Sequence, residues 1–272
     1  MVVELTKSNL SLADTLLAPL GAFQPMCVAV LTGVYPGRVF LDDPKSPRVA
    51  FLSTSLDPQG AWCFLAGDAG QDEFRHTLNR MLHERKVIGK ETTDIILSAW
   101  PDDWQGRLKE IFHPWEVIPL PRRHYVAKRL DFNWKSLLLS SYRLIPLDVL
   151  LLQRGWVLPA QVQETLRKWE THSIRDDFGF VLAKGKEVCA WVTVDFVTWR
   201  QGDIGFFVME RHRRRGLATA AAAAAIEEAL RRGLVEIHWT CAQSNSYSIR
   251  IAETLSLERQ RDYQAYWVEL GE

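Results

Sequence analysis

A strand, a basic turn and an alanine-rich helix follow one another in the second half of the chain, and this succession constrains the fold most. The apolar run from Asp203 to Met209 predicts a strand, Arg211 to Arg215 form the turn, and Arg215 to Arg232 have the highest helix propensity available. Gly216 and Ala218 allow a ligand to approach the backbone, where free N–H groups and the helix dipole favour a phosphate or pyrophosphate. An ordinary strand–turn–helix with a solvated basic corner is the alternative, and the residues alone leave both open.

The segments around this turn alternate between strand and helix patterns. Phe180 to Ala183 and Val188 to Val197 flank Lys184-Gly185-Lys186, which predicts a hairpin. Three further elements complete the pattern: strands at 235–240 and 263–270, and a helix at 245–255. This order predicts an α+β layout with helices flanking one central, mixed but mostly antiparallel sheet.

The first part of the chain, to about residue 128, predicts a smaller α/β unit without a catalytic constellation. Its expected elements are helices at 9–20 and 74–85, strands at 38–41, 48–53 and 61–65, and a short β-branched run at 27–32. The basic and aromatic stretch from Arg122 to Tyr142 is interpreted as a linker or crossover, followed by two helices at 147–152 and 161–169. We therefore expect two domains, residues 1–128 and 129–272.

Charge balance and cysteine spacing limit the classes of function. The 33 basic and 33 acidic residues cancel, so no overall field attracts nucleic acid or an anionic membrane. The four cysteines lie far apart without a CxxC pair, which predicts reduced, buried thiols and no metal site. The first residues lack the pattern of a secretory leader, and the apolar stretch 21–34 is too short to span a bilayer. A cytoplasmic protein is expected, with neither nucleic acid nor membrane as partner.

Two groups of residues in the second half resemble the GNAT superfamily of acetyltransferases. The run Arg213 to Ala218 matches the superfamily's pyrophosphate loop, Q/R-x-x-G-x-G/A, with the strand before it and the helix after it. A second set resembles the signature of the zwittermicin-resistance-like GNAT acetyltransferases: Trp239, Cys241, Asn245, Ser248, Ala252 and Leu255. The resemblance is strong over residues 179–270, and a degenerate GNAT-like lobe is one interpretation of residues 1–128.

The resemblance implies acetyl-CoA as co-substrate, with positions for each part of that molecule. The strand ending Phe206-Phe207-Val208 would bind the pantetheine arm where it separates from the strand at 235–240. The pyrophosphate would lie on Arg213, Arg214, Arg215, Gly216, Leu217, Ala218 and Thr219. Asn245 and Ser248 would lie near the thioester, although Asn245 is equally well explained as a helix N-cap.

Catalytic residues are less clearly marked. Asp203 is the candidate base, and Asn245 and Tyr263 complete the candidate set, although a solvent-facing turn residue is the alternative for Asp203. Glu210 and His212 are expected to face solvent, and His238 to be a core residue. Two departures from the family concern the second helix: Ala252 stands where many members carry a tyrosine acid, and Ser256 replaces the usual glycine.

Three functions remain open from the sequence. The leading one is an acetyl-CoA-dependent N-acetyltransferase, an acyltransferase acting on a primary amine of a small molecule or peptide. The second is an acetyl-CoA-binding regulatory or sensor protein with little catalysis. The third is a nucleic-acid-linked factor that uses the basic stretch 122–135 and the arginine-rich turn. A homodimer is compatible with all three.

Overall fold

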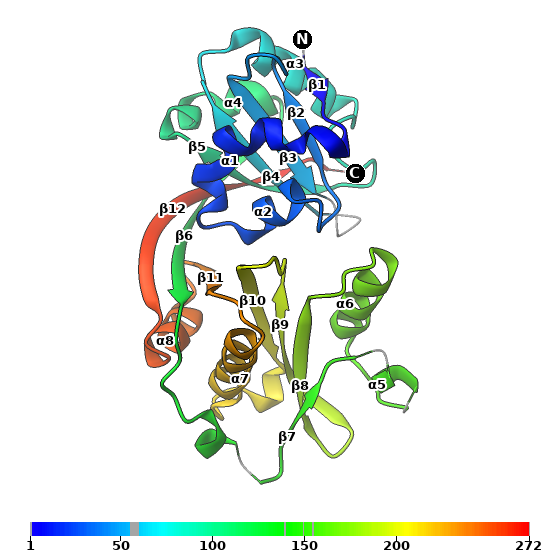
Figure 1. The fold of residues 1–272 in the computed structure, drawn as a ribbon, viewed down its shortest axis with the longest axis vertical. Coiled ribbons are helices and arrows are strands. Elements are labelled where there is room, and N and C mark those ends of the chain that lie inside the picture. Colours follow the sequence, from blue (N-terminus) through cyan, green and yellow to red (C-terminus); the bar gives the residue numbers. More distant parts are fainter. Residues whose placement is uncertain (1, 55–59, 139, 149, 154, 272) are drawn as a thin grey trace. The chain divides into compact units, whose positions relative to one another are not determined.

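The chain forms two compact units, which we describe from a computed structural model (Figure 1). The structure describes residues 2–54, 60–138, 140–148, 150–153 and 155–271. Unit 1 comprises Met1–Arg122 together with Asp262–Glu272, and unit 2 comprises Arg123–Arg261. This division differs from the expected one at residue 128, because the final segment of the chain returns to unit 1.

Unit 1 contains a sheet with the strand order β1-β2-β3-β4-β5-β12. Its strands are β1 (Val3–Glu4), β2 (Arg38–Leu41), β3 (Val49–Thr54), β4 (Gly60–Gly67), β5 (Asp94–Trp100) and part of β12 (Glu258–Glu269). Its helices are α1 (Asp14–Gly21), α2 (Pro25–Leu31), α3 (Asp72–His83) and α4 (Leu108–Phe112), with 3-10 turns at Lys7–Ala13 and Asp102–Gly106. β4 and β5 are parallel, and the other neighbouring strands pair antiparallel.

Unit 2 contains a sheet with the strand order β6-β11-β10-β9-β8-β7. Its strands are part of β6 (Val117–Ala127), then β7 (Arg143–Pro146), β8 (Phe178–Lys184), β9 (Glu187–Asp195), β10 (Gln201–Val208) and β11 (Glu236–Ala242). Its helices are α5 (Leu150–Gln153), α6 (Ala160–Thr171), α7 (Leu217–Arg231) and α8 (Ser246–Thr254), with 3-10 turns at Trp134–Leu137 and Glu210–His212.

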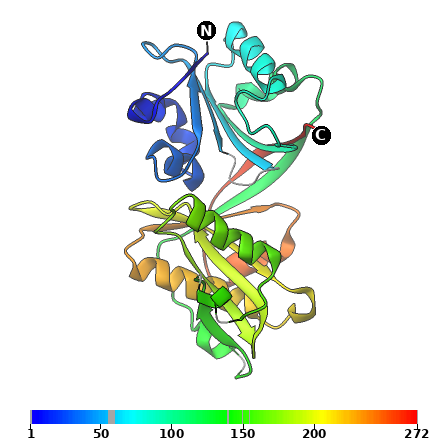
Figure 2. The ribbon, with the colours of Figure 1, turned by 90° about the vertical axis from the view of Figure 1, so that its right-hand side faces the viewer.

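Helix α7 forms the centre of the unit 2 core. Its buried alanines, Ala220 to Ala225 and Ala229, pack against Val192, Val194 and Trp239 in one hydrophobic cluster. Figure 1 shows α7 in front of this sheet, and Figure 2 gives the same unit from the side. A second cluster, which includes Val162 and Leu166 of α6, packs beside Val181 and Trp191. The expected α+β architecture, with helices flanking a mixed sheet, is therefore confirmed.

The two halves of the chain repeat the same order of elements once the 3-10 turns are set aside. Each series runs strand, two helices, three strands, helix, strand, helix, strand: from β1 to β6 and from β7 to β12. The last strand of each series lies in the sheet of the other unit. Ala265–Glu269 of β12 pair antiparallel with Ser98–Asp94 of β5, while β6 adjoins β11.

One local expectation from the sequence is wrong, and one run that suggested no definite element is a helix. The first residues of the expected linker, 122–127, lie in strand β6 (Val117–Ala127), and Tyr125 and Ala127 belong to the unit 2 core. The β-branched run 27–32 lies mostly in helix α2, which begins at Pro25, a residue suited to the first turn of a helix. Burial of Cys27, Ala29 and Val30 on that helix outweighs the local preference for a strand.

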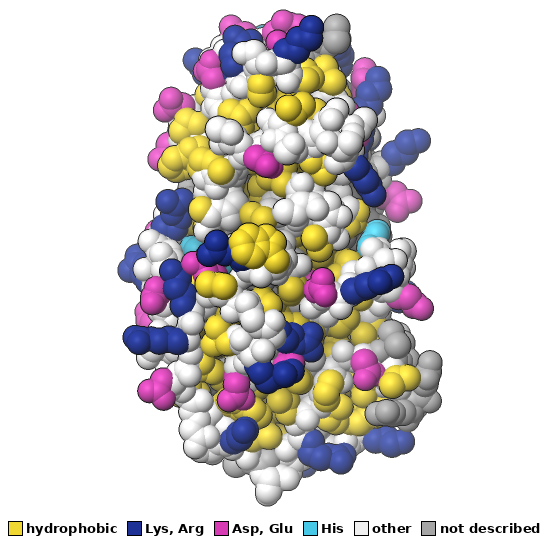
Figure 3. All heavy atoms as spheres, in the orientation of Figure 1, with side chains coloured by type: hydrophobic (Ala, Val, Ile, Leu, Met, Phe, Trp, Pro, Cys, Tyr) yellow, Lys and Arg dark blue, Asp and Glu magenta, His cyan; other side chains and the backbone are white. Residues whose placement is uncertain are grey.

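The surface carries both signs of charge. Figure 3 shows basic and acidic side chains interspersed over the face that it draws, as the equal counts in the sequence lead us to expect. Among the described residues, no helix is both long and apolar enough to cross a membrane.

Candidate functional site

The central strands of unit 2 separate partway along their length. β10 pairs with β9 from Asp203 to Val208, but in the described chain it pairs with β11 over three positions, Gln201–Asp203 opposite Glu236–His238. Both strands continue beyond that point, β10 to Val208 and β11 to Ala242. The β11-side edge of the second half of β10 therefore presents backbone N–H and C=O groups that can bind an extended ligand.

The basic turn leads from the end of β10 into helix α7. Arg214 and Gly216 adopt left-handed backbone conformations, with φ of 60° and 74°. Gly216 is the N-cap of α7 and has no side chain with which to cap the first turn. The first N–H groups of this 15-residue helix thus remain available to an anion, and the helix dipole adds to that preference.

These elements enclose a groove of about 770 Å³. It is lined by Phe206, Phe207, Val208, Glu210, His212, Arg213, Arg214, Gly216, Leu217, Ala218, Thr219, Asn245, Tyr247, Ser248, Arg250 and Ile251. The structure thus brings together every predicted cofactor-binding residue except Arg215. The guanidinium of Arg215 instead donates a hydrogen bond to the Tyr142 hydroxyl at 3.1 Å.

The arginines around the groove fall into two sets. Arg211 pairs with Glu187 at 2.6 Å, and Arg213 Nε donates to the Val208 carbonyl at 3.3 Å. Arg214 and Arg250 line the groove and are exposed, and neither guanidinium makes a hydrogen bond or ion pair with the described residues. These two cations are therefore available to a phosphate without the loss of an existing contact.

Helix α8 begins at the groove with a hydrogen-bonded cap. Asn245 Oδ1 accepts from the Ser248 backbone N–H at 3.1 Å, which confirms the N-cap, and the Trp239 indole N–H donates to Ser248 Oγ at 3.0 Å. Tyr247 lines the same groove and is 73% exposed. Neither Tyr247 nor Arg250 stands out in the sequence, because a helix-start motif does not mark which flanking side chains face a ligand.

The predicted catalytic residues are more dispersed. Asp203 lies inside β10, paired on both sides, so the alternative of a turn residue is wrong. Asp203 is absent from the residues that line the groove, whereas Asn245 is among them. Tyr263 belongs to unit 1, where its hydroxyl accepts from Gln24 Nε2 at 2.9 Å and its ring packs on Phe23.

Two histidines form a buried pair beside Asp203. His238, a core residue as expected, lies opposite Asp203, and its Nδ1 is 3.0 Å from Nε2 of His124 on β6. Burial lowers the pKa of His124 to about 3 and that of His238 to about 4, and the proximity of the two rings also disfavours a charge on His124. Both imidazoles are therefore neutral near pH 7. His124 could not be identified from the sequence, because a pairing across 114 residues has no local pattern.

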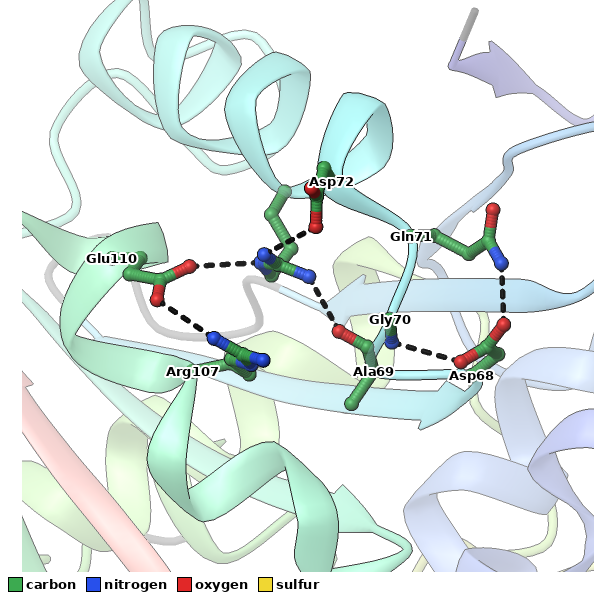
Figure 4. Close-up of polar contacts among 8 residues, drawn as sticks. Asp68, Ala69, Gly70, Gln71, Asp72, Arg107 and Glu110 are labelled. Atoms are coloured by element: carbon green, nitrogen blue, oxygen red, sulfur yellow. Dashed lines mark hydrogen bonds and ion pairs between the residues drawn. The ribbon is translucent and has the colours of Figure 1, made fainter.

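The corresponding position in unit 1 is built differently. β4 and β5 pair in parallel over seven positions, from Gly60 and Asp94 to Ala66 and Trp100, so these strands do not separate as β10 and β11 do. The turn from β4 into α3 is acidic, and Figure 4 shows Asp68 accepting hydrogen bonds from the Gly70 N–H and the Gln71 side chain. These bonds lower the pKa of the Asp68 carboxyl, that from Gln71 most.

The first turn of α3 is likewise occupied by charged side chains of unit 1. The Arg75 guanidinium pairs with Asp72 at 2.6 Å and with Glu110 at 3.0 Å, and donates to the Ala69 carbonyl. Figure 4 shows Asp72, Glu110 and Ala69, the partners in these contacts. Carboxylates thus stand at this helix start, where unit 2 has Arg213 to Arg215.

Comparison with known proteins decides the family. A family model described as GNAT acetyltransferase matches residues 20–266. The chain belongs to the GNAT acetyltransferase family. This GNAT protein is 24% identical over 265 residues to the Bacillus subtilis (strain 168) protein named uncharacterized N-acetyltransferase YdfB, a match that spans 97% of each chain.

Two solved structures show the same fold. A GCN5-related N-acetyltransferase-like protein from Streptococcus suis superposes with a TM-score of 0.65 at 23% identity, covering 93% of this chain and 97% of that one. A tandem GNAT protein from the clavulanic acid biosynthesis pathway superposes with a TM-score of 0.63 at 14% identity, covering 100% and 99%. The chain is thus a GNAT-type N-acetyltransferase, as the resemblance implied.

Proposed function

We propose that this chain transfers the acetyl group of acetyl-CoA to a primary amine of a small molecule or peptide. The observation that supports this most is the groove of unit 2, which combines a free strand edge with a helix start and unpaired arginines. Acetyl-CoA carries amides, a pyrophosphate and a further phosphate along one extended molecule. The groove offers a complementary group for each of them.

The fit can be followed along the groove. The backbone of Phe206 to Val208 would hydrogen-bond the pantetheine amides in the manner of an added strand. The N–H groups from Gly216 to Thr219 would hold the pyrophosphate at the start of α7. Arg214 and Arg250 would neutralise the phosphates, and the exposed Tyr247 ring offers a stacking surface for the adenine.

The thioester supplies an activated acyl group, so the protein contributes positioning and proton management. Asp203 remains the candidate base for the attacking amine, because its carboxylate lies on β10 where the strands begin to separate. Asn245 remains the candidate at the thioester end. The assignment of Tyr263 stays a prediction.

We also propose that the chain belongs to the zwittermicin-resistance-like group. The signature residues form one packed unit: Trp239 and Ser248 are hydrogen-bonded, and Cys241, Ala252 and Leu255 lie in the unit 2 core. Because these residues pack together, a change of one of them would disturb the fit of α8 on β11.

Unit 1 is, in this proposal, a degenerate GNAT repeat without a donor site. Its elements follow the same order as those of unit 2, but β4 and β5 remain paired and the turn before α3 carries carboxylates. Closed strands leave no edge for pantetheine, and carboxylates at a helix start repel phosphates. One acetyl-CoA is therefore expected per chain.

Calorimetric titration of acetyl-CoA into the whole protein tests the proposal. Gly216→Leu forces a side chain onto a left-handed backbone in the groove, and we expect weaker binding by at least about tenfold. Gly233→Leu is the matched control, because Gly233 also has a positive φ but lies beyond the other end of α7. The wild type and Gly233→Leu should each bind one equivalent.

Turnover with a panel of amines then separates the transferase from the regulatory or sensor protein, the first two of the three functions named above. Release of free CoA that depends on an amine supports the transferase. Saturable binding without release with any amine would favour a regulatory protein. No binding by the wild type would contradict the proposal.

A further inference from the structure

The basic turn is held in place by residues far from it in the sequence. His212 is buried, contrary to the expectation that it faces solvent, and its Nδ1 lies 3.2 Å from the Tyr142 hydroxyl. Its Nε2 lies 2.8 Å from Glu187 Oε1. A neutral imidazole satisfies both contacts when the Tyr142 hydroxyl donates to Nδ1 and the Nε2–H donates to the carboxylate.

Both ends of this contact chain return to the turn. Arg215 donates to the Tyr142 hydroxyl at 3.1 Å, and Arg211 pairs with Glu187 at 2.6 Å. A continuous series of polar contacts therefore connects Arg215 to Arg211 through Tyr142, His212 and Glu187. We call Tyr142, His212 and Glu187 the bracket.

The bracket spans the part of the turn that needs support. Arg214 lies between the two tied arginines and has a φ of 60°, a conformation that costs a non-glycine residue free energy. Surrounding contacts must offset that cost for the conformation to persist. Leu137 lies 3.9 Å from the position where Gly216 would carry a Cβ, so Leu137 also contacts the start of α7.

Two residues of the bracket could instead belong to a metal site. Glu187, Cys189 and His212 have ligand atoms within 4.8 Å of one another. However, the Glu187 carboxylate already pairs with Arg211, and both nitrogens of His212 are hydrogen-bonded. A cation would have to displace these contacts beside a guanidinium, so the hydrogen-bonded bracket explains the cluster better.

We infer that Tyr142, His212 and Glu187 are positioning residues that hold the Arg211–Arg215 turn in the shape that binds the pyrophosphate of the acyl donor. This inference rests on the proposed function. Since Tyr142 and Glu187 do not line the groove, they act through His212 and the two tied arginines. Loss of the bracket should weaken acetyl-CoA binding and leave the acetyl-transfer step itself intact.

The test measures the Kd of acetyl-CoA by calorimetry, and kcat and KM by steady-state kinetics, for Tyr142→Phe and Glu187→Gln. Each variant should raise Kd and the KM for acetyl-CoA by about three- to tenfold, with kcat at saturation within about twofold of the wild type. Tyr142→Phe removes the contact at Nδ1 of His212, and Glu187→Gln removes the negative charge that faces Nε2 and Arg211. Because both changes act on one path through His212, the double variant should lose less than the product of the two single losses.

Two control substitutions match these changes. Tyr125→Phe removes a buried hydroxyl that has no hydrogen-bond partner among the described residues, and Glu164→Gln alters a surface pair with Lys168 on α6. Both should keep the Kd of the wild type. Thermal unfolding checks that each variant is folded, and if Tyr142→Phe fails to fold, Glu187→Gln carries the test.

The outcomes separate the two proposals. Wild-type binding with an unchanged Kd in both bracket variants would overturn the inference alone, as would a fall in kcat with no change in Kd. If the increase in Kd in the double variant equals the product of the two single increases, the two residues act independently. That result would contradict the inference that they act through one path. No binding of acetyl-CoA by the wild type would instead contradict the proposed function, and the inference with it.

Discussion

Asp203 lies opposite His238 at the last paired position between β10 and β11, just before the two strands separate. On its other side Asp203 faces Asp195 of β9, and His238 is hydrogen-bonded to His124 of β6. Directly opposed residues on neighbouring strands place their side chains on the same face of a sheet. Asp195, Asp203, His238 and His124 therefore form one row across the unit 2 sheet. This row lies where β10 and β11 separate and the edge of β10 becomes available to a ligand.

This row leads to a prediction for Asp203. If its carboxylate takes the proton from the amine, Asp203→Asn should lower kcat by about 10²- to 10⁴-fold and leave the Kd of acetyl-CoA almost unchanged. Asp195→Asn, in the same row on the adjacent strand, should keep a kcat within a few-fold of the wild type. Kinetics over pH 6–9 would check this, and equal losses in both variants would point to a structural role of the row.

The histidine pair predicts how stability depends on pH. The folded-state pKa values, about 3 for His124 and about 4 for His238, lie below the value of about 6.5 expected in the unfolded chain. The unfolded chain binds more protons in this range, so the stabilisation is fully present above pH 6.5. It is lost as the pH falls toward 4, by roughly 3 kcal/mol for each histidine.

Denaturant unfolding at pH 7, 6, 5 and 4 measures this loss. His238→Asn keeps a polar atom near His124 and should show a flatter curve. NMR titration of the imidazoles is a second readout: two of them should remain neutral down to pH 5. If all the imidazoles titrated near pH 6.5, the assignment of a buried neutral pair would be contradicted.

The two unpaired arginines, Arg214 and Arg250, predict that contacts with the phosphates contribute to the binding of acetyl-CoA. Arg250→Ala and Arg214→Ala should each raise the KM for acetyl-CoA by about three- to thirtyfold, because each removes a charge-assisted contact. The loss should shrink at 0.5 M salt, where exposed charges are screened. Arg231→Ala, on the far part of α7 and paired with Glu228, is the control and should leave KM unchanged.

The end of helix α8 predicts a stabilising substitution. Ser256 has a φ of 53°, and the N–H groups of Ser256 and Leu257 bond the carbonyls of Glu253 and Ala252, as in a Schellman motif. Ser256→Gly should raise the free energy of unfolding by about 0.5–1 kcal/mol, because glycine adopts this conformation without strain.

Helix α7 ends in the same motif and supplies the reverse test. Gly233 has a φ of 93°, and a Cβ there would contact nothing within 4 Å. Gly233→Ser should therefore cost a similar free energy through the backbone alone. Urea denaturation measures both variants, and a Ser256→Gly variant less stable than the wild type would show that the serine side chain contributes more than its strain costs.

Much of unit 2 could be predicted because its signals are local. The strand before Arg213, the turn and the alanine-rich helix follow one another in the sequence. The groove lies at the junction of these three elements, as the sequence predicts. Arg215 was assigned to the groove because it stands in the loop motif, but Tyr142, 73 residues away, draws its guanidinium elsewhere. His212 was misplaced for the same reason, since its partners Tyr142 and Glu187 come from distant segments.

The sheet to which β5, β6 and β12 belong could not be predicted, for a different physical reason. The pattern of an isolated strand indicates which residues turn inward, but not which sheet it joins. The sequence pattern therefore suggests a linker for residues 122–127 of β6, and it places β12 with the second half, which β12 follows in the sequence. β5, at Asp94–Trp100, was missed altogether although it is the strand that β12 joins.

The place of β12 also has a consequence for the order in which the protein can be made. Residues 1–122 leave the ribosome while Asp262–Glu272 have yet to be synthesised, and at ~5–20 residues per second the interval is roughly ten to thirty seconds. During that time the edge of β5 lacks the strand that covers it, and open strand edges attract other chains. The N-terminal unit thus completes its sheet after the C-terminus emerges, and nascent chains interrupted before residue 262 should be recognised by chaperones as unfinished.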